Sequence, residues 1–330
     1  MSRRGWLLFL IMCFIWGIPY LMIKVAVESV SVPVLIFVRT AVGAAVLLPL
    51  ALRGGQLAGL VRYWRPLLAF ATIEIILPWW LLSDAERRVS SSMAALVIAA
   101  APIIAVVAAR IIGDGDGDRL TAARWAGLVL GFAGVVVLVG PDLRGGDPWA
   151  IVELLLTACG YATAPLLAAR RLKDVPSLPM TAVCLTIAAL VYTPAAALNW
   201  PQVMPPGRVL AALAGLALIC TALAFVVFFA LIREVGPTRS VIFTYINPVV
   251  AVLAGVVVLS ESVTPGMLIA SALILGGSVT AAGRRRSPED EVTDDLQRGL
   301  VPGVHDQEVG DRTRPPGRQA VADAPGQADE

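Results

Sequence analysis

Apolar runs of about twenty residues recur along this chain and are separated by short polar gaps. A helix rises about 1.5 Å per residue, so each run is long enough to cross roughly 30 Å of hydrocarbon. Apolar residues make up 58% of the chain and charged residues 15%, too few charges to cover a soluble fold of 330 residues. The run 129–139 (VLGFAGVVVLV) lacks the alternation of a membrane β-strand. The sequence therefore predicts an all-α integral membrane protein.

Ten such runs predict ten transmembrane helices. Their approximate bounds are residues 6–25, 33–52, 66–83, 91–112, 123–140, 149–169, 179–198, 209–231, 239–260 and 265–282. From residue 283 onward the composition shifts to Pro, Gly, Asp and Gln with few apolar residues. Such a segment buries too little apolar surface to offset the entropy lost on ordering. We expect residues 283–330 to form a disordered tail.

Basic residues are distributed unevenly between the two sets of loops. If the N-terminus is cytoplasmic, sixteen Lys and Arg residues near the membrane lie on the cytoplasmic side and four on the other. An excess of basic residues is typical of cytoplasmic loops. We therefore expect both termini to be cytoplasmic. Abundant Arg, Ala and Val suggest GC-rich coding and favour a bacterial plasma membrane as the location of this multi-pass protein.

The two halves of the chain repeat one another. Residues 87–108 align without gaps with residues 233–254 at an offset of 146, which matches Pro102 with Pro248. Each half contains five predicted helices, an odd number, so the second half enters the membrane from the opposite side. The predicted domains are a first repeat at 1–140, a second repeat at 141–282 and the tail. Inverted repeats are typical of secondary transporters, whose substrate site lies near the midplane.

Several motifs resemble the drug/metabolite transporter superfamily, in its EamA-type ten-helix branch. The first half contributes Phe14-Ile-Trp-Gly17 and Arg39. The second half contributes Thr221-Ala-Leu-Ala-Phe225, Arg233-Glu-Val-Gly-Pro237, Tyr245-Ile-Asn-Pro-Val-Val250 and Ser260-Glu261. The resemblance covers about residues 6–282 and implies a small-solute carrier, commonly an exporter of amino acids, their derivatives or other metabolites.

Trp16, Tyr20 and Lys24 share one face of the first predicted helix, because they are spaced i, i+4 and i+8. Trp16 and Tyr20 are therefore candidates for an aromatic wall of the substrate path. Packing of Trp16 inside the bundle is an equal alternative. For Lys24 we favour an ammonium that reaches the membrane interface.

Arg39 and Glu74 are charged residues inside otherwise apolar predicted helices. A charge at this depth is unfavourable and usually faces a partner or an aqueous cavity. Their depths in the membrane differ by only a few ångströms at about 1.5 Å per residue, so the two side chains could pair. A structural ion pair and a substrate-contacting or proton-coupled role are both open.

Pro102 and Pro248 occupy equivalent positions in the two halves. Each proline deprives the carbonyl four residues earlier of its hydrogen bond, which predicts a kink near the centre of the protein. Thr244, Tyr245 and Asn247 offer polar groups in the same turn as Pro248. We predict that these five residues line the substrate site, with simple helix packing as the alternative.

Small residues four apart predict close helix packing. Gly127 and Gly131 form one such pair, and Ala272 with Gly276 form its counterpart in the second half. We expect a packing role and no chemistry from either pair.

These features predict a secondary transporter of small metabolites that works by alternating access around a midplane site. The alternatives are a membrane-embedded enzyme acting on a lipid-linked substrate and a non-transporting scaffold subunit. The four cysteines are scattered and the one histidine, His305, lies in the tail, so we expect no metal and no cofactor. Expected partners are a small-molecule substrate and the lipid bilayer, without nucleic acid. A coupled proton and a homodimer are hypotheses.

Overall fold

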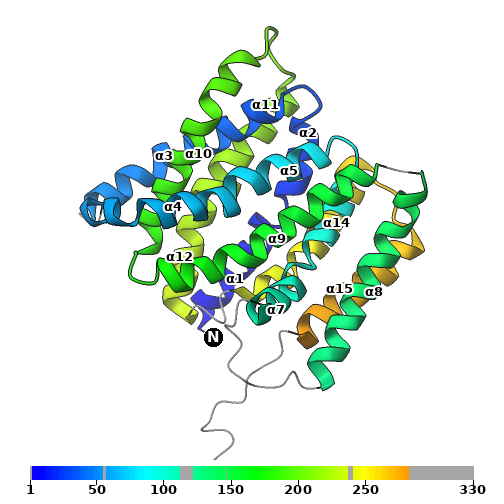
Figure 1. The fold of residues 1–330 in the computed structure, drawn as a ribbon. Helices are drawn as coiled ribbons and strands as arrows, with labels where there is room; N and C mark the ends of the chain where they lie inside the picture. Colours follow the sequence, from blue (N-terminus) through cyan, green and yellow to red (C-terminus); the bar gives the residue numbers. More distant parts are fainter. Residues whose placement is uncertain (1, 55–56, 112–121, 146, 237–240, 282–330) are drawn as a thin grey trace, which may run out of the picture. The chain divides into compact units, whose positions relative to one another are not determined.

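Every regular element described in the computed structural model is a helix (Figure 1). The structure describes residues 2–54, 57–111, 122–145, 147–236 and 241–281. The predicted tail, 283–330, lies outside these residues. The all-α membrane class is confirmed, because seven helical segments within the described ranges are long and apolar enough to span a bilayer and three shorter apolar helices accompany them.

Several of the predicted spans are built from more than one helix. In chain order the elements are α1 (Arg3–Ile15), α2 (Pro19–Ala26), α3 (Val32–Arg53), η1 (Ala58–Tyr63), α4 (Trp64–Ala71), η2 (Thr72–Ile76), α5 (Leu77–Ala85), α6 (Ser91–Ile98), α7 (Ala101–Ile111), α8 (Ala122–Gly145), α9 (Pro148–Arg171), α10 (Ser177–Leu198), α11 (Gly207–Ala214), η3 (Gly215–Leu223), α12 (Ala224–Val235), η4 (Val241–Tyr245), α14 (Asn247–Leu259) and α15 (Pro265–Ala281). The span boundaries agree with the predicted ones to within a few residues, apart from the third span, which begins earlier.

Polar contacts join the helix ends into two opposite ends of the bundle. At one end, which we call the basic end, the Ser2 hydroxyl donates to Glu234 at the end of α12 (2.5 Å). We call the other end the Glu86 end, after the residue that follows α5. There Arg88, shortly after α5, forms an ion pair with Asp147 at the start of α9 (2.8 Å). Thus α1 begins at the basic end and α9, the first helix of the second half, begins at the Glu86 end. The two halves are inverted.

Exposed tryptophans mark both ends of the bundle. Five tryptophan side chains at or next to helix ends are about half exposed: Trp6, Trp64 and Trp125 at the basic end, and Trp149 and Trp200 at the Glu86 end. Tryptophan is enriched at both membrane–water interfaces because its ring is apolar with one polar N–H. The two groups of rings therefore bracket the bilayer.

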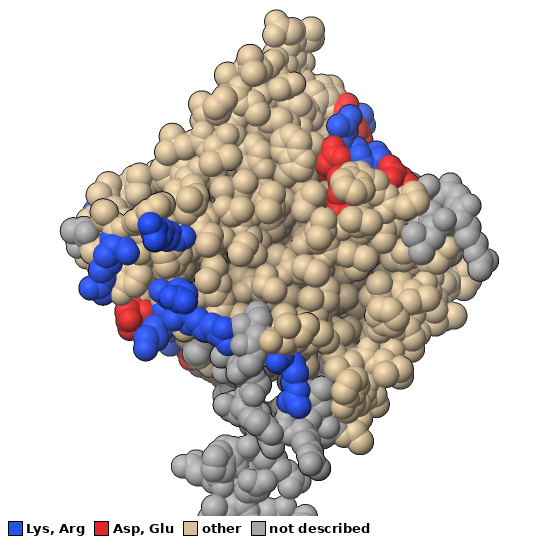
Figure 2. Space-filling model, viewed as in Figure 1, with Lys and Arg blue, Asp and Glu red and all other residues tan. Residues whose placement is uncertain are grey.

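Charged side chains cluster at the same two ends. On the face shown in Figure 2, basic residues gather at the lower left and a mixed basic and acidic patch lies at the upper right, with an uncharged surface between them. Exposed basic residues at the basic end, among those the structure describes, are Arg3, Arg4, Arg53, Arg62, Arg65, Arg110, Arg170, Arg171, Lys173 and Arg233. This distribution supports a cytoplasmic basic end.

Reporter fusions should place the two ends on opposite sides of the membrane. A fusion after Gly54, which caps α3, should report the cytoplasm, and one after Gln202, between α10 and α11, should report the outside. A reporter active only in the cytoplasm and one active only outside give complementary signals at each position. The same side for both positions would contradict the span count.

Helices α8 and α15 pack along one another, as Figure 1 shows. Their contact uses Gly131 and Gly134 on α8 and Gly277 on α15. The predicted counterpart on α15, Ala272 with Gly276, is wrong, because both residues are exposed. The buried face of α15 instead runs through Ala270, Ile274 and Gly277. The sequence predicted close packing of small residues on this helix, but the residue that makes the contact is Gly277 and not Gly276.

Candidate functional site

The third span of each repeat contains a π-helical segment. In the first half it is η2, and in the second half it is η3. The repeat offset of 146 maps residues 72–76 onto 218–222, which lie within η3. Pro78 explains the first segment, because it has no N–H to give to the carbonyl of Glu74. π-Helical turns are frequent at functional sites, and both repeats have one at an equivalent position. The side chains around these two turns are therefore candidate site residues.

Arg39 on α3 lies where the two repeats cross. Gly43, one turn further along α3, leaves room for the Thr221 side chain of η3. The Arg39 Nε donates to the Thr221 hydroxyl (2.9 Å), which in turn donates to the carbonyl of Leu216 (2.8 Å). The guanidinium lies 3.7 Å from the ring centre of Trp79. The side chain is 7% exposed, so a positive charge is fixed inside the bundle.

Arg39 and Glu74 do not form the ion pair that their depths allowed. Within the described ranges, Arg39 makes its hydrogen bond to Thr221, and no carboxylate lies within 4.0 Å of its guanidinium. The Oε2 of Glu74 is buried without a hydrogen-bond partner. Tyr161 on α9 interacts electrostatically with both Arg39 and Glu74. Arg39 and Glu74 are therefore a buried cation and a buried acid that are not directly paired.

Tyr161 is a site residue that the sequence analysis missed. The preceding Gly160 allows α9 to lie directly on the third span, because a Cβ there would meet the carbonyl of Ile73 and the ring of Pro78. This close crossing carries Tyr161 toward Glu74 and toward Tyr20 of α2. A glycine followed by an aromatic residue in an apolar helix was the available signal.

The first span is interrupted between α1 and α2. The N–H groups of Gly17 and Ile18 both bond to the carbonyl of Phe14, so the carbonyl of Cys13 loses its helical partner. When the Asn247 amide is oriented so that its nitrogen faces these acceptors, it donates to the carbonyl oxygens of Cys13 (3.2 Å) and Phe243 (3.1 Å). In a membrane such a freed carbonyl must be satisfied, and Asn247 does this across the repeat interface.

Most of the other predicted residues lie near this interruption, at the end of α1 and on η4 and α14, whereas Pro102 lies on α7. Trp16 packs against the rings of Phe225, Phe228 and Phe243 at centroid distances of 5.8, 5.0 and 5.2 Å, which favours the packing interpretation. Helix α7 begins one residue before Pro102, and α14 begins at the equivalent position, one residue before Pro248. A proline is well tolerated in the first turn of a helix, where its missing N–H has no partner to lose. Tyr245 is half-buried, and the side chain of Thr244 is exposed.

Glu86, at the end of α5, was also missed. It is 0% exposed, and neither carboxylate oxygen has a hydrogen-bond partner within the described residues. The Lys24 ammonium donates to the backbone carbonyls of Glu86 (2.6 Å) and Val89 (2.7 Å), which lie in the loop between the third and fourth spans. Tyr20, one turn earlier on α2, interacts electrostatically with both Glu86 and Arg39.

Glu261 joins the repeats at the Glu86 end by capping α6. Its carboxylate accepts from the backbone N–H and hydroxyl of Ser91 (both 2.8 Å) and of Ser92 (3.1 and 2.5 Å). Ser260 adopts a left-handed conformation (φ 55°) that turns the chain after α14 toward α6. A carboxylate at a helix N-terminus is favoured by unpaired N–H groups and by the helix dipole.

Replacing Glu261 with alanine should lower the free energy of unfolding by about 1–3 kcal/mol, because the N–H groups of Ser91 and Ser92 lose their acceptor. Burial would raise the pKa of Glu261, but hydrogen bonds from Ser92 and Ser91 outweigh it and hold that pKa below 4.5. The stabilisation should thus be present above about pH 4.5 and fade as the pH falls through the lowered value. Thermal denaturation in detergent measures both effects. Glu28→Ala, which removes an exposed ion pair with Arg208, is the control and should cost less than about 1 kcal/mol.

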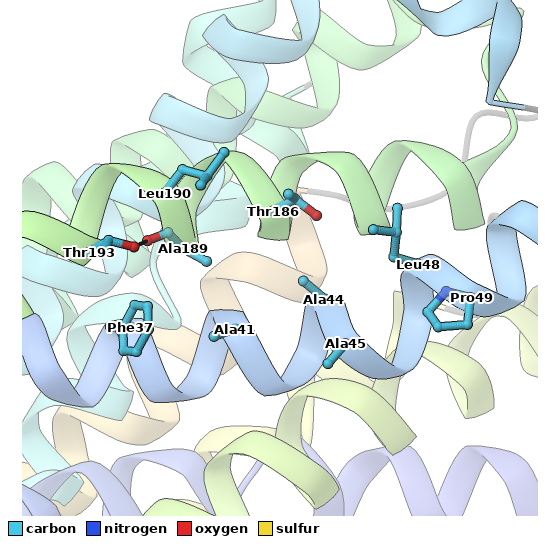
Figure 3. Close-up of a pocket in the computed structure, with 10 residues that line it drawn as sticks. All are labelled: Phe37, Ala41, Ala44, Ala45, Leu48, Pro49, Thr186, Ala189, Leu190 and Thr193. Carbon is cyan, nitrogen blue, oxygen red and sulfur yellow. Dashed lines mark hydrogen bonds between the residues drawn. The ribbon is translucent and has the colours of Figure 1, made fainter.

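Two apolar grooves lie beside α3 at the surface of the bundle. Thr186 and Thr193 are the polar residues among the ten that line the groove between α3 and α10 (Figure 3), and their hydroxyls donate to backbone carbonyls. The second groove is lined by apolar residues of α3, α4 and α10 and by the segment around η1. None of the nine predicted site residues lines either groove. These grooves lack free polar groups that could orient a polar solute.

Inverted repeats, interrupted helices and a buried cation together define a multi-pass membrane transporter. A model of the EamA-like transporter family matches residues 3–140 and again residues 148–282. The chain belongs to this family, within the drug/metabolite transporter superfamily, as the motif resemblance implied.

Relatives of this chain carry similar descriptions. The Escherichia coli K12 protein named "Uncharacterized inner membrane transporter YedA" is 30% identical over 248 residues, covering 73% of this chain and 78% of YedA. An "Uncharacterized transporter" of Archaeoglobus fulgidus is 20% identical over 86% of this chain and 100% of its own length. A solved crystal structure shares the fold, with a TM-score of 0.60 at 22% identity, over 85% of this chain and 97% of that one. The family and these names favour transport over catalysis.

Proposed function

We propose that this transporter exports small metabolites that carry a carboxylate, such as amino acids and their derivatives, by alternating access of its two repeats. The observation that carries this proposal is the Arg39 guanidinium. Its Nε is bonded to Thr221, while the N–H groups of Nη1 and Nη2 have no acceptor among the described residues. The resemblance to EamA-type exporters supports the direction of transport.

The surroundings of Arg39 suit a carboxylate. An arginine offers its Nη edge as a planar fork that matches the two oxygens of a carboxylate, and stacking on Trp79 fixes the plane of that fork. In a buried site this contact is stronger than in water, because fewer water dipoles screen it. Tyr20 and Tyr161 add phenolic hydroxyls nearby, within electrostatic range of the guanidinium. Together these groups could orient a small polar solute.

Counterflow in proteoliposomes tests this function. Vesicles containing the purified protein and loaded with an unlabelled amino-acid mixture should accumulate labelled amino acids from outside, whereas protein-free vesicles should not. The matching decarboxylated amines should give no counterflow, since they lack the group that Arg39 binds. Equal counterflow of amino acids and amines would contradict the carboxylate anchor. No counterflow with any pool of carboxylate metabolites would contradict the function.

A further inference from the structure

Glu86 is a buried acid that the proposed function leaves unused. Its two carboxylate oxygens are sealed from solvent and have no donor within the described ranges. The ammonium of Lys24 approaches, but it donates to the backbone carbonyls of Glu86 and Val89. An ionised carboxylate buried without a direct partner is strongly unfavourable. The geometry thus suits a neutral, protonated Glu86.

Charged and titratable groups from several elements act on Glu86. Lys24 on α2 and Arg39 on α3 favour its ionised form, while Glu261 after α14 opposes it, and Tyr20 also lies within electrostatic range. The negative charge of Glu261 is already engaged by Ser91 and Ser92. Burial is the dominant influence and raises the pKa of Glu86 well above its usual value, despite the two cations.

A proton suits this site better than a metal cation. A hard metal cation needs several oxygen ligands. Across the residues that the structure describes, no group of three or more His, Cys, Asp or Glu side chains could hold a metal. The Lys24 ammonium, 2.6 Å from the Glu86 carbonyl, would also repel a metal ion.

We propose that Glu86 is a proton-binding site that makes the opening and closing of the Glu86 end depend on the pH on that side of the membrane. This inference rests on the proposed transport function. In the closed arrangement seen here, the Glu261 cap and the Lys24 bonds hold the Glu86 end together, and Glu86 is sealed as a neutral acid. When this end opens, water reaches the carboxyl and the proton leaves. Closing the end again requires a proton, so the proton concentration on that side biases the conformational cycle.

The transport test compares exchange with net flux in proteoliposomes. In the wild type, raising the pH on the side that the Glu86 end faces should slow net substrate flux several-fold, because closing this end requires a proton, and the same change on the other side should have little effect. Glu86→Gln should keep wild-type counterflow at low pH and show a net flux that does not change with the pH on the Glu86 side. Asp84→Asn is the matched control, because Asp84 lies in the same turn but pairs with Arg87 and Arg88, so its response to pH should match the wild type.

A stability measurement tests the same site without transport. Because the folded-state pKa is raised, Glu86 stabilises the fold at low pH, and this contribution is lost as the pH rises through that value. The melting temperature of the wild type should therefore fall relative to that of Glu86→Gln as the pH increases from about 4.5. If Glu86→Gln fails to accumulate, Glu86→Leu, which buries no polar atom, replaces it in both experiments.

The outcomes separate the two proposals. A wild type without counterflow overturns the proposed function, and the melting curves then decide alone whether Glu86 binds a proton. A pH response like that of the wild type in the Glu86 variant overturns the role of Glu86 as the pH-sensitive group. A response that is lost in Glu74→Gln and kept in Glu86→Gln also overturns it, because it assigns the pH sensitivity to Glu74.

Discussion

Replacing Arg39 with leucine should strongly reduce transport of carboxylate substrates and leave the protein folded in the membrane. Hydrogen bonds to charged groups contribute about 1.5–3 kcal/mol, so the loss of the anchor should reduce apparent affinity about 10- to 150-fold. Folding should tolerate the change, because no buried carboxylate loses its ion-pair partner. The Thr221 hydroxyl also keeps its bond to Leu216. Counterflow and membrane abundance, measured on the same preparations, check both statements.

Two further variants sharpen this experiment. Arg208→Leu removes an exposed arginine that pairs with Glu28 and should transport normally. Arg39→Lys keeps the charge but not the planar fork or the stacking on Trp79, so it should retain only part of the activity. If Arg39→Leu transports at the wild-type rate, the anchor must be sought elsewhere, beginning with Tyr20, Tyr245 and Asn247.

The helical spans could be predicted because each depends on local composition alone. Twenty apolar residues must cross the bilayer as a helix whatever their neighbours are. The interruptions at Pro102 and Pro248 were predictable for a similar reason, since a proline acts on its own backbone. For Asn247, sequence suggested a central position, and the structure adds its partner, the carbonyl of Cys13.

The relation between Arg39 and Glu74 could not be predicted, because depth along a helix does not give direction around it. Arg39 turns toward the second half, where Gly43 admits Thr221. Glu74 interacts with Tyr161 of α9 and Cys184 of α10. These directions follow from helix crossings between segments far apart in sequence, which one sequence read for periodicity does not contain.

Glu86 illustrates a different limit. It stands in Asp84-Ala-Glu-Arg-Arg88, a run of charges that is typical of an exposed loop. Its neighbours Arg87 and Arg88 are indeed exposed, while Glu86 points into the bundle beneath Lys24. Glu86 is buried and the adjacent Arg87 is exposed, because the chain turns at the end of α5. Local composition describes the whole turn and cannot indicate that one acid in it is buried.

Replacing Gly277 with leucine should disrupt the fold, because α8 and α15 then cannot approach. A Cβ at Gly277 would lie 2.6 Å from the Cα of Gly131 and 2.7 Å from the carbonyl oxygen of Gly127, and neither backbone atom can move aside as a flexible side chain could. Overpacking of this kind costs about 1–3 kcal/mol or more, enough to lower membrane abundance several-fold. Gly276→Leu is a matched control one residue away. Gly276 is exposed, and a Cβ at this position would have no neighbouring atom within 4 Å, so this variant should accumulate and melt like the wild type. Equal abundance and melting temperature for both variants would show that the two helices do not depend on this contact.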